Sequence, residues 1–277
     1  MIIKSAMTAS FFFAAFAASI AGAAREYSPD AHTIFLWHLD TPSSMRIENS
    51  VTPDASNNKI DGQRGRSNVD MGFPSVPGLG LAVGNFRGDR LLRVGSDPRL
   101  MNIGQGFTIE MWLRDPLSGN GWQTSNPHNK FAVIAQYRAQ KIQWMLRINH
   151  ASKSLQFVAI AEARNFIYAE INSGELDWKE GQWYHIAATC EIIAPDRIEV
   201  KIFRSLPGAK EVVPLTVKNM KCTPDDLIIH NVLQKGEIRI GGSGSGSRFL
   251  GSGCRIDEVR YSSVPRSKDD FLEHISK

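Results

Sequence analysis

Hydrophobic and polar residues alternate along most of this sequence, which is the period of a β-strand. In residues 106–114 (GFTIEMWLR), the odd-numbered side chains from Phe107 to Leu113 fall on one face, and the even-numbered ones from Thr108 to Arg114 fall on the other. The pattern therefore predicts a strand here. Comparable runs occupy residues 33–40, 131–138, 143–149, 155–162, 166–171, 183–192, 197–204, 212–217, 237–241 and 255–261.

The connections between these runs are short. Residues 149–153 (NHASK) join two of them, and Pro195-Asp196 joins another pair. Such short links favour antiparallel hairpins, and no long helical crossover is present to build a parallel α/β sheet. A two-sheet sandwich and a closed barrel remain, and the many Trp, Phe and Ile residues at alternate positions favour the sandwich. We expect an all-β fold of two antiparallel sheets.

Three segments depart from the strand pattern. Residues 48–90 are polar and rich in Gly and Asn, and we expect a long irregular excursion there, of the kind that is usually functional or stiffened by a metal. Ser267, followed by Asp270 and an apolar pair, predicts the start of one short C-terminal helix. The Gly/Ser run at 241–247 lies too close to the end to link a second domain, so we interpret it as a turn.

The first residues have the pattern of a signal peptide. Lys4 precedes an apolar run over residues 5–20, and Ala21-Gly22-Ala23 is a small-residue cleavage site. An N-terminal membrane anchor is the alternative, although the run is short against the ~20 residues of a bilayer span. We predict a signal peptide at 1–23, an exported protein (secreted or periplasmic) and no membrane span after cleavage.

The charged residues and the cysteines limit which partners, disulfides and metal sites the chain can have. The chain has 32 basic and 28 acidic residues without a long basic run, so nothing indicates nucleic-acid binding. Cys190, Cys222 and Cys254 allow one disulfide and one leftover thiol in an oxidising compartment. No cysteine or histidine pair has the spacing of zinc ligands, and Cys190 lies in an apolar strand pattern typical of a small buried residue.

A series of phrases carries a family resemblance. The order IFLWHLD, DASNN, GFTIEMWLR, GQWYHIAAT, IRIGG and FLGSGCRIDEVRYSSVPRS resembles the laminin-G-like jelly-roll domain of the concanavalin A-like lectin and glucanase superfamily. Its most specific parts are GQWYHIAAT (181–189) and F-x-G-x-x-x-x-IDEVR (249–260). The resemblance covers residues 33–266, with a tail at 24–32 before it and a helical tail at 267–277 after it. It implies two antiparallel sheets, one of them concave, but it fixes no function.

The resemblance also implies a calcium site, because many members of this family hold Ca²⁺ with Asp side chains and carbonyl groups near a sheet edge. The loop here reads Ser56-Asn57-Asn58-Lys59 instead of the family's S-G-N-G, and Lys59 adds a positive charge. In the alternative interpretation, Asp54 and Asn57 cap turns. The matching positions are Asp40, Asp54 and Asp257, with Asn57, Asn58 and Asp61 of the same loop as further oxygen donors.

Sugar binding would use an exposed aromatic ring with amides or carboxylates around it. The loop 118–130 offers such a ring in Trp122, and Trp178 is a second candidate. Both tryptophans could instead close over the edge of the core. The polar residues beside Trp122 are Asn120, Gln123, Asn126, His128 and Asn129. Trp37, Trp112, Trp144 and Trp183 lie within strand patterns and are expected in the core or on a sheet face.

The catalytic signals are weak. Related glucanases use paired carboxylates on one strand, whereas strict alternation in RIDEVRY puts Asp257 and Glu258 on opposite faces. No G-x-S-x-G or HExxH motif occurs, and His185 is expected to be a hydrogen-bonded structural histidine. Arginines between residues 62 and 99 would suit acidic glycans if they gathered into a patch, and would otherwise be ordinary solvated side chains.

These patterns favour an exported, non-catalytic binding module. The expected partner is a polysaccharide or other glycan, with Ca²⁺ as a possible cofactor. The alternative is an extracellular or envelope protein-interaction module without a sugar site, and a glycoside hydrolase ranks third.

Overall fold

The computed structural model describes residues 23–40, 51–64, 70–86, 92–95, 97–101, 104–117, 130–138, 141–149, 152–160, 166–170, 176–223, 236–242, 250 and 253–276. The residues of the predicted sugar loop at 118–129 and of the signal peptide at 1–22 lie outside these ranges. Within them, no helix is both long and apolar enough to cross a bilayer.

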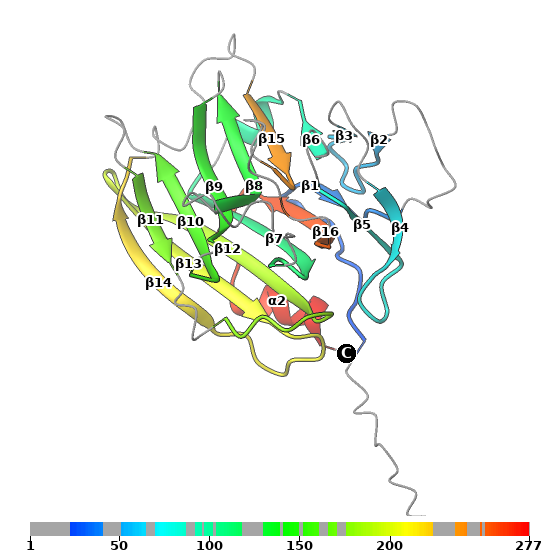
Figure 1. Cartoon of the computed structure of the whole chain (residues 1–277). Helices are drawn as coiled ribbons and strands as arrows, with labels where there is room; N and C mark the ends of the chain where they lie inside the picture. The colour runs from blue at the N-terminus through cyan, green and yellow to red at the C-terminus, as the bar shows by residue number, and fades with distance from the viewer. Residues whose placement is uncertain are drawn as a thin grey trace, which may run out of the picture.

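The strands form two antiparallel sheets that face each other, with one short helix at the C-terminal end (Figure 1). Sheet A runs in the order β14 (Pro214–Lys221), β13 (Arg197–Ser205), β12 (Trp183–Ala194), β7 (Gly106–Arg114), β16 (Arg255–Ser262), β5 (Leu81–Gly84) and β4 (Asp70–Pro74), and β1 (Thr33–Trp37) also pairs with β16. Sheet B runs in the order β11 (Phe166–Glu170), β10 (Ser154–Ile160), β9 (Lys141–Asn149), β8 (Lys130–Arg138), β15 (Gly236–Ile240), β6 (Leu92–Val94), β3 (Gly62–Arg64) and β2 (Val51–Thr52). The predicted all-β, two-sheet antiparallel sandwich is confirmed.

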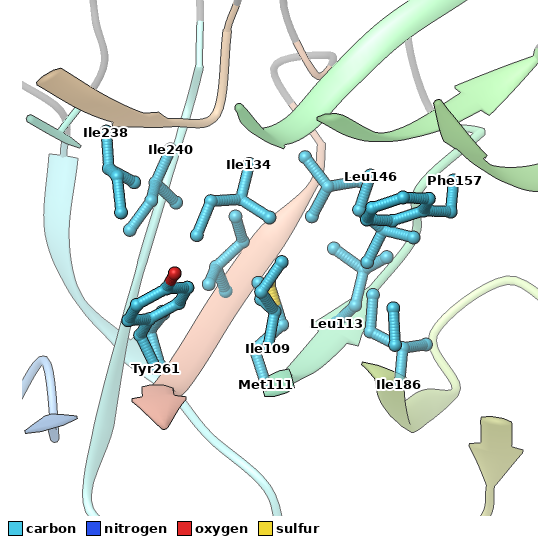
Figure 2. Packing of buried hydrophobic residues seen from close by; sticks show 14 of the residues in the cluster. Ile109, Met111, Leu113, Ile134, Leu146, Phe157, Ile186, Ile238, Ile240 and Tyr261 are labelled. Carbon is cyan, nitrogen blue, oxygen red and sulfur yellow. The ribbon is translucent and has the colours of Figure 1, made fainter. Parts of the chain in front are cut away.

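The core lies between the two sheets and follows from the alternation of the strands. Figure 2 shows Ile109, Met111 and Leu113 of β7 pointing toward Ile134 of β8 and Leu146 of β9, which come from the opposite sheet. All five side chains are fully buried. Burying an aliphatic side chain of this size contributes about 1.5–3 kcal/mol, so this layer holds the two sheets together.

The polar segment at 48–90 was predicted as irregular, and this prediction was wrong. It contains β2 to β5, and β6 follows directly; β2, β3 and β6 extend sheet B, while β4 and β5 extend sheet A. These strands have only two to five residues each. Strands this short carry too few alternating positions to produce a strand signal, and three of them also contain Gly.

Helix α2 (Lys268–Ile275) begins where the sequence predicted it. The Ser267 side chain accepts a hydrogen bond from the Asp270 backbone N–H, and the Asp270 carboxylate accepts one from the Ser267 N–H, which completes a capping box. The cap satisfies N–H groups that the first helical turn leaves unpaired. Phe271, His274 and Ile275 then form the buried face of the helix.

The tryptophans expected in the core or on a sheet face are buried. Trp37, Trp112 and Trp144 have no exposed surface, and Trp183 is 5% exposed. The three cysteines are also buried, but all are free thiols, so the structure does not contain the predicted disulfide. Burial raises the pKa of Cys190 well above its usual value, which agrees with the expected role of Cys190 as a small core residue.

The outer face of sheet B carries a small cluster of its own. Ala135, Met145 and Val158 are buried there on neighbouring strands. Beside them, Arg147 Nε donates to Gln156 Oε1 at 2.7 Å, and both of these side chains are almost fully buried. This face therefore combines apolar and hydrogen-bonded groups.

Candidate functional site

The outer face of sheet A, which points away from the core, concentrates the titratable side chains. On β7 this face presents Thr108, Glu110, Trp112 and Arg114, because the odd-numbered residues fill the core. Strand register places β16 and β12 residues beside them. Arg260 and Ala187 lie opposite Glu110, Asp257 and His185 lie opposite Trp112, and Arg255 and Trp183 lie opposite Arg114.

Most of this face is covered by the two ends of the described chain. The Ala24 N–H donates to the Pro77 carbonyl and the Arg25 N–H donates to the His274 carbonyl, each at 3.0 Å. In Figure 1 the blue N-terminal segment accordingly runs beside the red helix α2. Tyr27 and Phe271 pack with Trp112 and Phe203 into a second buried apolar cluster. The N-terminal segment (residues 23–32) and α2 thus form a lid over the sheet.

Glu110 is the centre of the charge network under this lid. Its carboxylate accepts from Arg260 Nε at 2.7 Å and lies 3.3 Å from His185 Nε2. Burial would raise the pKa of Glu110, but the charge of Arg260 and the hydrogen bond with His185 outweigh it and hold the pKa at about 2. His185 is fully buried, and the prediction of a structural histidine is confirmed.

Arg266 ties the N-terminal segment to the sheet. Its Nη2 atom lies 2.8 Å from both carboxylate oxygens of Asp30, and its Nε donates to Ser262 Oγ at 2.8 Å. Although partial burial opposes it, the hydrogen bond from Arg266 lowers the pKa of Asp30 to about 2. Each guanidinium under the lid therefore has an acidic partner.

A β-bulge in β16 overturns the predicted alternation of RIDEVRY. The register with β7 shifts between Asp257 and Arg260, and Glu258 adopts a φ of 50°. Ile256, Val259 and Tyr261 face the core. Asp257 and Glu258 both lie on the other side, so the prediction that they face opposite ways was wrong. A bulge inserts one extra residue, after which the faces exchange.

The two carboxylates of the bulge are buried, and that of Glu258 contacts the lid. Glu258 Oε2 accepts from the Tyr27 N–H at 2.8 Å, and its Oε1 lies 2.7 Å from His38 Nδ1. Asp257 accepts from Ser75 Oγ and from the Glu258 N–H. Burial raises the pKa of Asp257, and the neighbouring Glu258 raises it further. Both side chains are at most 1% exposed, so this pair is a buried structural cluster.

The open end of the same face contains a pocket of about 140 Å³. Arg114 and Arg255 line it as directly opposed residues of β7 and β16. The other lining residues are Phe73, Pro74, Asp115 and Gly253. We call this the arginine pocket.

Packing fixes the position of Arg255 in the arginine pocket. Its guanidinium carbon lies 3.7 Å from the centroid of the Phe73 ring, and Nη1 donates to the Cys254 carbonyl at 2.9 Å. The side chain crosses Gly84, where a Cβ would stand only 2.5 Å from Arg255 Cδ. A glycine at this position of β5 therefore leaves the space that the guanidinium occupies.

Asp115 positions the second arginine. Its Oδ2 accepts from Arg114 Nε at 3.1 Å, while its Oδ1 accepts from the Gly181 N–H at 2.6 Å. Asp115 has a φ of 49°, which turns the chain sharply at the end of β7. Both oxygens of this carboxylate are thus already engaged by protein donors.

A larger pocket of about 330 Å³ lies elsewhere, lined by Ile34, Pro98, Arg99 and Ser263. Arg99 is already paired there, because its Nε and Nη2 donate to the two oxygens of Asp97 at 2.8 and 2.6 Å. Its Nη1 also donates to Asn58 Oδ1 at 2.9 Å. This pocket therefore has less capacity for a charged ligand than the arginine pocket.

The predicted calcium residues occupy separate hydrogen-bonding roles. Asp54 accepts from the Leu36, Ser56 and Ile60 N–H groups and from Ser56 Oγ, which fits the alternative in which it caps the loop. Asp40 accepts from the Leu81 N–H. Across the described ranges, no three His, Cys, Asp or Glu side chains are positioned to hold a metal ion. Asn57 is exposed, and the Lys59 that replaces the family glycine adopts a φ of 58°.

Trp178 is the one predicted sugar-binding residue within the described ranges. Its Nε1 donates to the Lys153 carbonyl at 3.0 Å, and its ring meets the Tyr184 ring edge-on at 4.9 Å. The Arg204 guanidinium lies over the ring at 5.7 Å. This position fits the alternative in which the ring closes over the edge of the core. Trp122, Asn120, Gln123, Asn126 and His128 lie outside the described residues.

Sequence reasoning missed the arginine pocket. Arg114 and Arg255 each end or begin a predicted strand, and no local motif marks them. Their pairing depends on the β7–β16 register, which joins segments far apart in the sequence. The only local signals were an arginine at the outer position of each strand end.

Comparison with solved structures supports the fold. No protein-family model matches the sequence, and no curated protein matches it. Among solved structures, the binding domain of Paraclostridial Mosquitocidal Protein 1 is similar, with a TM-score of 0.56, 13% identity and 87% of this chain covered. The binding domain of Botulinum Neurotoxin DC in complex with SialylT has a TM-score of 0.52 and 12% identity over 87% of the chain. The same domain in complex with rat synaptotagmin II has a TM-score of 0.50 and 12% identity over 86%.

This chain spans about half the length of these neighbours, covering 51%, 50% and 50% of them. At such low identity, the similarity shows a shared sandwich fold. The neighbours themselves are described as binding domains.

Proposed function

We propose that this protein is an exported, non-catalytic module of laminin-G-like type that binds a carbohydrate. The arginine pocket carries the proposal. Its groups come from strand ends of one rigid sheet and combine an aromatic ring with charged hydrogen-bond donors. Ligand sites commonly join a few fixed polar groups to an aromatic or apolar wall in this way. The complex of a similar binding domain with SialylT gives this interpretation further support.

Burial of the carboxylates supports a non-catalytic role. Glycoside hydrolysis needs two carboxyl groups that reach the same glycosidic bond. Asp257, Glu258 and Glu110 are all at most 1% exposed and engaged by protein donors. A polysaccharide has no access to them in this arrangement.

Docking of the chain just after the predicted cleavage point supports export. Ala24 would be the first residue of the mature chain, and it is 2% exposed with its N–H donating to the Pro77 carbonyl. A cut after Ala23 would leave the lid intact. N-terminal sequencing of the exported protein would test this cut, and a start at any residue beyond Ala24 would contradict it.

Affinity electrophoresis through gels that carry neutral and acidic polysaccharides tests the function. Retardation by at least one polymer is expected, and unchanged migration in every gel would contradict the proposal. Parallel gels with EDTA test the proposed calcium assistance, which predicts weaker retardation after chelation. Trp122→Ala tests which face binds. Loss of retardation in this variant would assign binding to the predicted loop at 118–130, and unchanged retardation would favour the arginine pocket.

Protein association is the second candidate function, and exposed apolar side chains at one sheet edge favour it. Ile193, Leu206, Val213 and Val217 are 44–50% exposed. Val217 lies on β14, the edge strand of sheet A, while Leu206 follows β13 and Val213 precedes β14. An apolar edge suits a protein partner better than a sugar. Val217→Lys should abolish capture of an envelope protein in a pull-down if this candidate is correct, and should leave glycan retardation unchanged.

A further inference from the structure

The larger pocket, of about 330 Å³, is built from three segments that lie far apart in the sequence. Ile34 belongs to β1, Ser263 directly follows β16, and Pro98 and Arg99 belong to the short 3₁₀ helix η1 (Pro98–Met101). We call this the η1 pocket. Its volume lies within the range of roughly 300–1,000 Å³ that is common for ligand sites, so size alone permits a small ligand.

Asn58 fixes two walls of the η1 pocket relative to each other. Its Nδ2 donates to the Thr33 and Ile34 carbonyls at 2.8 and 3.0 Å, and its Oδ1 accepts from Arg99 Nη1 at 2.9 Å. This side chain thus connects β1 with η1 through three hydrogen bonds. A pocket held in this way is formed before a ligand arrives, which reduces the entropy lost on binding.

The positive charge of Arg99 is compensated by the protein itself. Its Nε and Nη2 donate to the two oxygens of Asp97 at 2.8 and 2.6 Å. These hydrogen bonds lower the pKa of Asp97, so its carboxylate is ionised at neutral pH. A bidentate ion pair of this kind leaves little attraction for a further anion. The η1 pocket therefore suits an uncharged ligand.

The η1 pocket still has hydrogen-bonding capacity for a ligand. An arginine carries five N–H donors, and only those to Asp97 and Asn58 are engaged among the described residues. The Ser263 hydroxyl donates to the His32 carbonyl at 3.3 Å, so its oxygen can accept a bond from a ligand. A ligand hydroxyl both accepts and donates, and it can satisfy both groups.

The remaining wall is apolar. Pro98 is exposed, and Ile34 is half-buried and packs against the core. A sugar ring presents C–H groups on its faces and hydroxyl groups around its edge, which matches an apolar wall beside a few polar groups. A purely apolar ligand would leave the N–H groups of Arg99 and the oxygen of Ser263 without partners, at a cost in binding.

We propose that the η1 pocket binds an uncharged sugar residue. A ring hydroxyl accepts from Arg99 and donates to Ser263, while a C–H face of the ring lies against Ile34 and Pro98. This inference rests on the proposed glycan-binding function and assigns it a second site. The arginine pocket lies at the other end of β16, because Arg255 begins this strand and Ser263 follows its last residue. At the rise of a β-strand, the two residues are roughly 25 Å apart, so substitutions in one pocket leave the other in place.

Affinity electrophoresis tests the ligand class with two neutral polymers, dextran and galactomannan, and one acidic polymer, polygalacturonate. At least one neutral polymer should retard the full-length protein. Ser263→Ala removes the accepting oxygen and should weaken this binding about 2- to 10-fold. Arg99→Met removes the N–H donors but keeps an apolar chain, and should weaken it about tenfold or more. The matched controls, Ser28→Ala and Arg197→Gln, change exposed residues and should leave binding unchanged.

Asp97→Asn tests the charge argument. The substitution keeps the size of the side chain but leaves the Arg99 guanidinium without its carboxylate. This variant should gain retardation by polygalacturonate relative to the natural chain. An unchanged response to polygalacturonate would overturn the assignment of an uncharged ligand. Urea unfolding of all the variants verifies that they fold, so loss of binding is not confused with loss of structure.

The outcomes separate the inference from the proposed function. Neutral-polymer retardation that neither Ser263→Ala nor Arg99→Met weakens would overturn the inference and leave glycan binding standing. Retardation by polygalacturonate alone would have the same meaning. Equal losses in the two control variants would overturn the pocket, because a general surface effect would then explain the binding. Unchanged migration with every polymer would overturn both the inference and the proposed function.

Discussion

One face of sheet A carries arginines in two surroundings. Under the lid, Arg260 lies 2.7 Å from Glu110, and Arg266 lies 2.8 Å from Asp30. At the open end, Arg114 Nε lies 3.1 Å from Asp115, and the Arg255 guanidinium, which stacks on the Phe73 ring, is partly exposed. A guanidinium removed from water needs an acidic partner, because desolvation of an unpaired charge costs several kcal/mol. Near solvent this desolvation cost is smaller, so the stability of the fold depends less on an acidic partner for each arginine there.

We expect the largest loss of stability from a substitution among the arginines under the lid. Arg260→Gln would leave the buried Glu110 carboxylate without its closest cation, and we expect a loss of about 3–5 kcal/mol in the free energy of unfolding. Urea unfolding monitored by tryptophan fluorescence measures this loss. A change below about 1 kcal/mol would mean that the network under the lid contributes little to folding.

The second largest effect should be a loss of folding stability at low pH, caused by His274 in the lid. Burial lowers the pKa of His274 to about 4, and the charge of Arg260 contributes, whereas the unfolded chain titrates near 6.5. The unfolded state therefore binds the proton first, so the stability is complete above pH 6.5 and falls as the pH drops toward 4. Glu110, whose folded pKa is about 2 against an ordinary 4.5, adds a further loss between pH 4.5 and 2.

Comparison with the His274→Gln variant isolates the contribution of His274 to the pH dependence of stability. Asp257 and Glu258 have raised pKa values and oppose the slope at low pH, so only the difference between the two proteins is informative. Urea midpoints at pH 7.5 and 4.5 should differ more for the natural chain than for the variant. Equal differences would exclude His274 as the source.

A substitution at the open end of the face should change the folding stability only slightly. Arg114→Gln relieves the repulsion from Arg255 and removes one partly exposed bond to Asp115. We expect a change within about 0.5 kcal/mol, in either direction, because partly exposed pairs contribute little. The same urea experiment applies. A loss as large as that of Arg260→Gln would show that both clusters are structural and would remove the contrast.

For the cysteines, we expect that reduction does not change the folding stability. Because Cys190, Cys222 and Cys254 are free thiols in the structure, a reducing agent should leave the urea midpoint unchanged. Titration of the denatured, unreduced protein should find three thiols per chain. Finding only one would restore the disulfide that the sequence suggested.

Alternation predicted β7 and most strands of 130–221 because each has a long run with one apolar face. The same rule failed at Glu258, since a bulge changes the period without changing the composition. It also failed for β2 to β6, which are too short to show a period. The arginine pocket depends on register between distant strands, and one sequence carries no information about that register.

Strand β16 lies in the middle of sheet A, although it follows all the strands that it pairs with in the sequence. It pairs with β7, β5 and β1, and Glu258 bonds to Tyr27 across 231 positions. Contacts of such long range slow folding, because a large loop must close before they form. Until β16 arrives, β7 and β1 each lack a neighbour and expose unpaired backbone. Truncation before residue 255 should therefore yield an aggregating chain instead of a smaller domain.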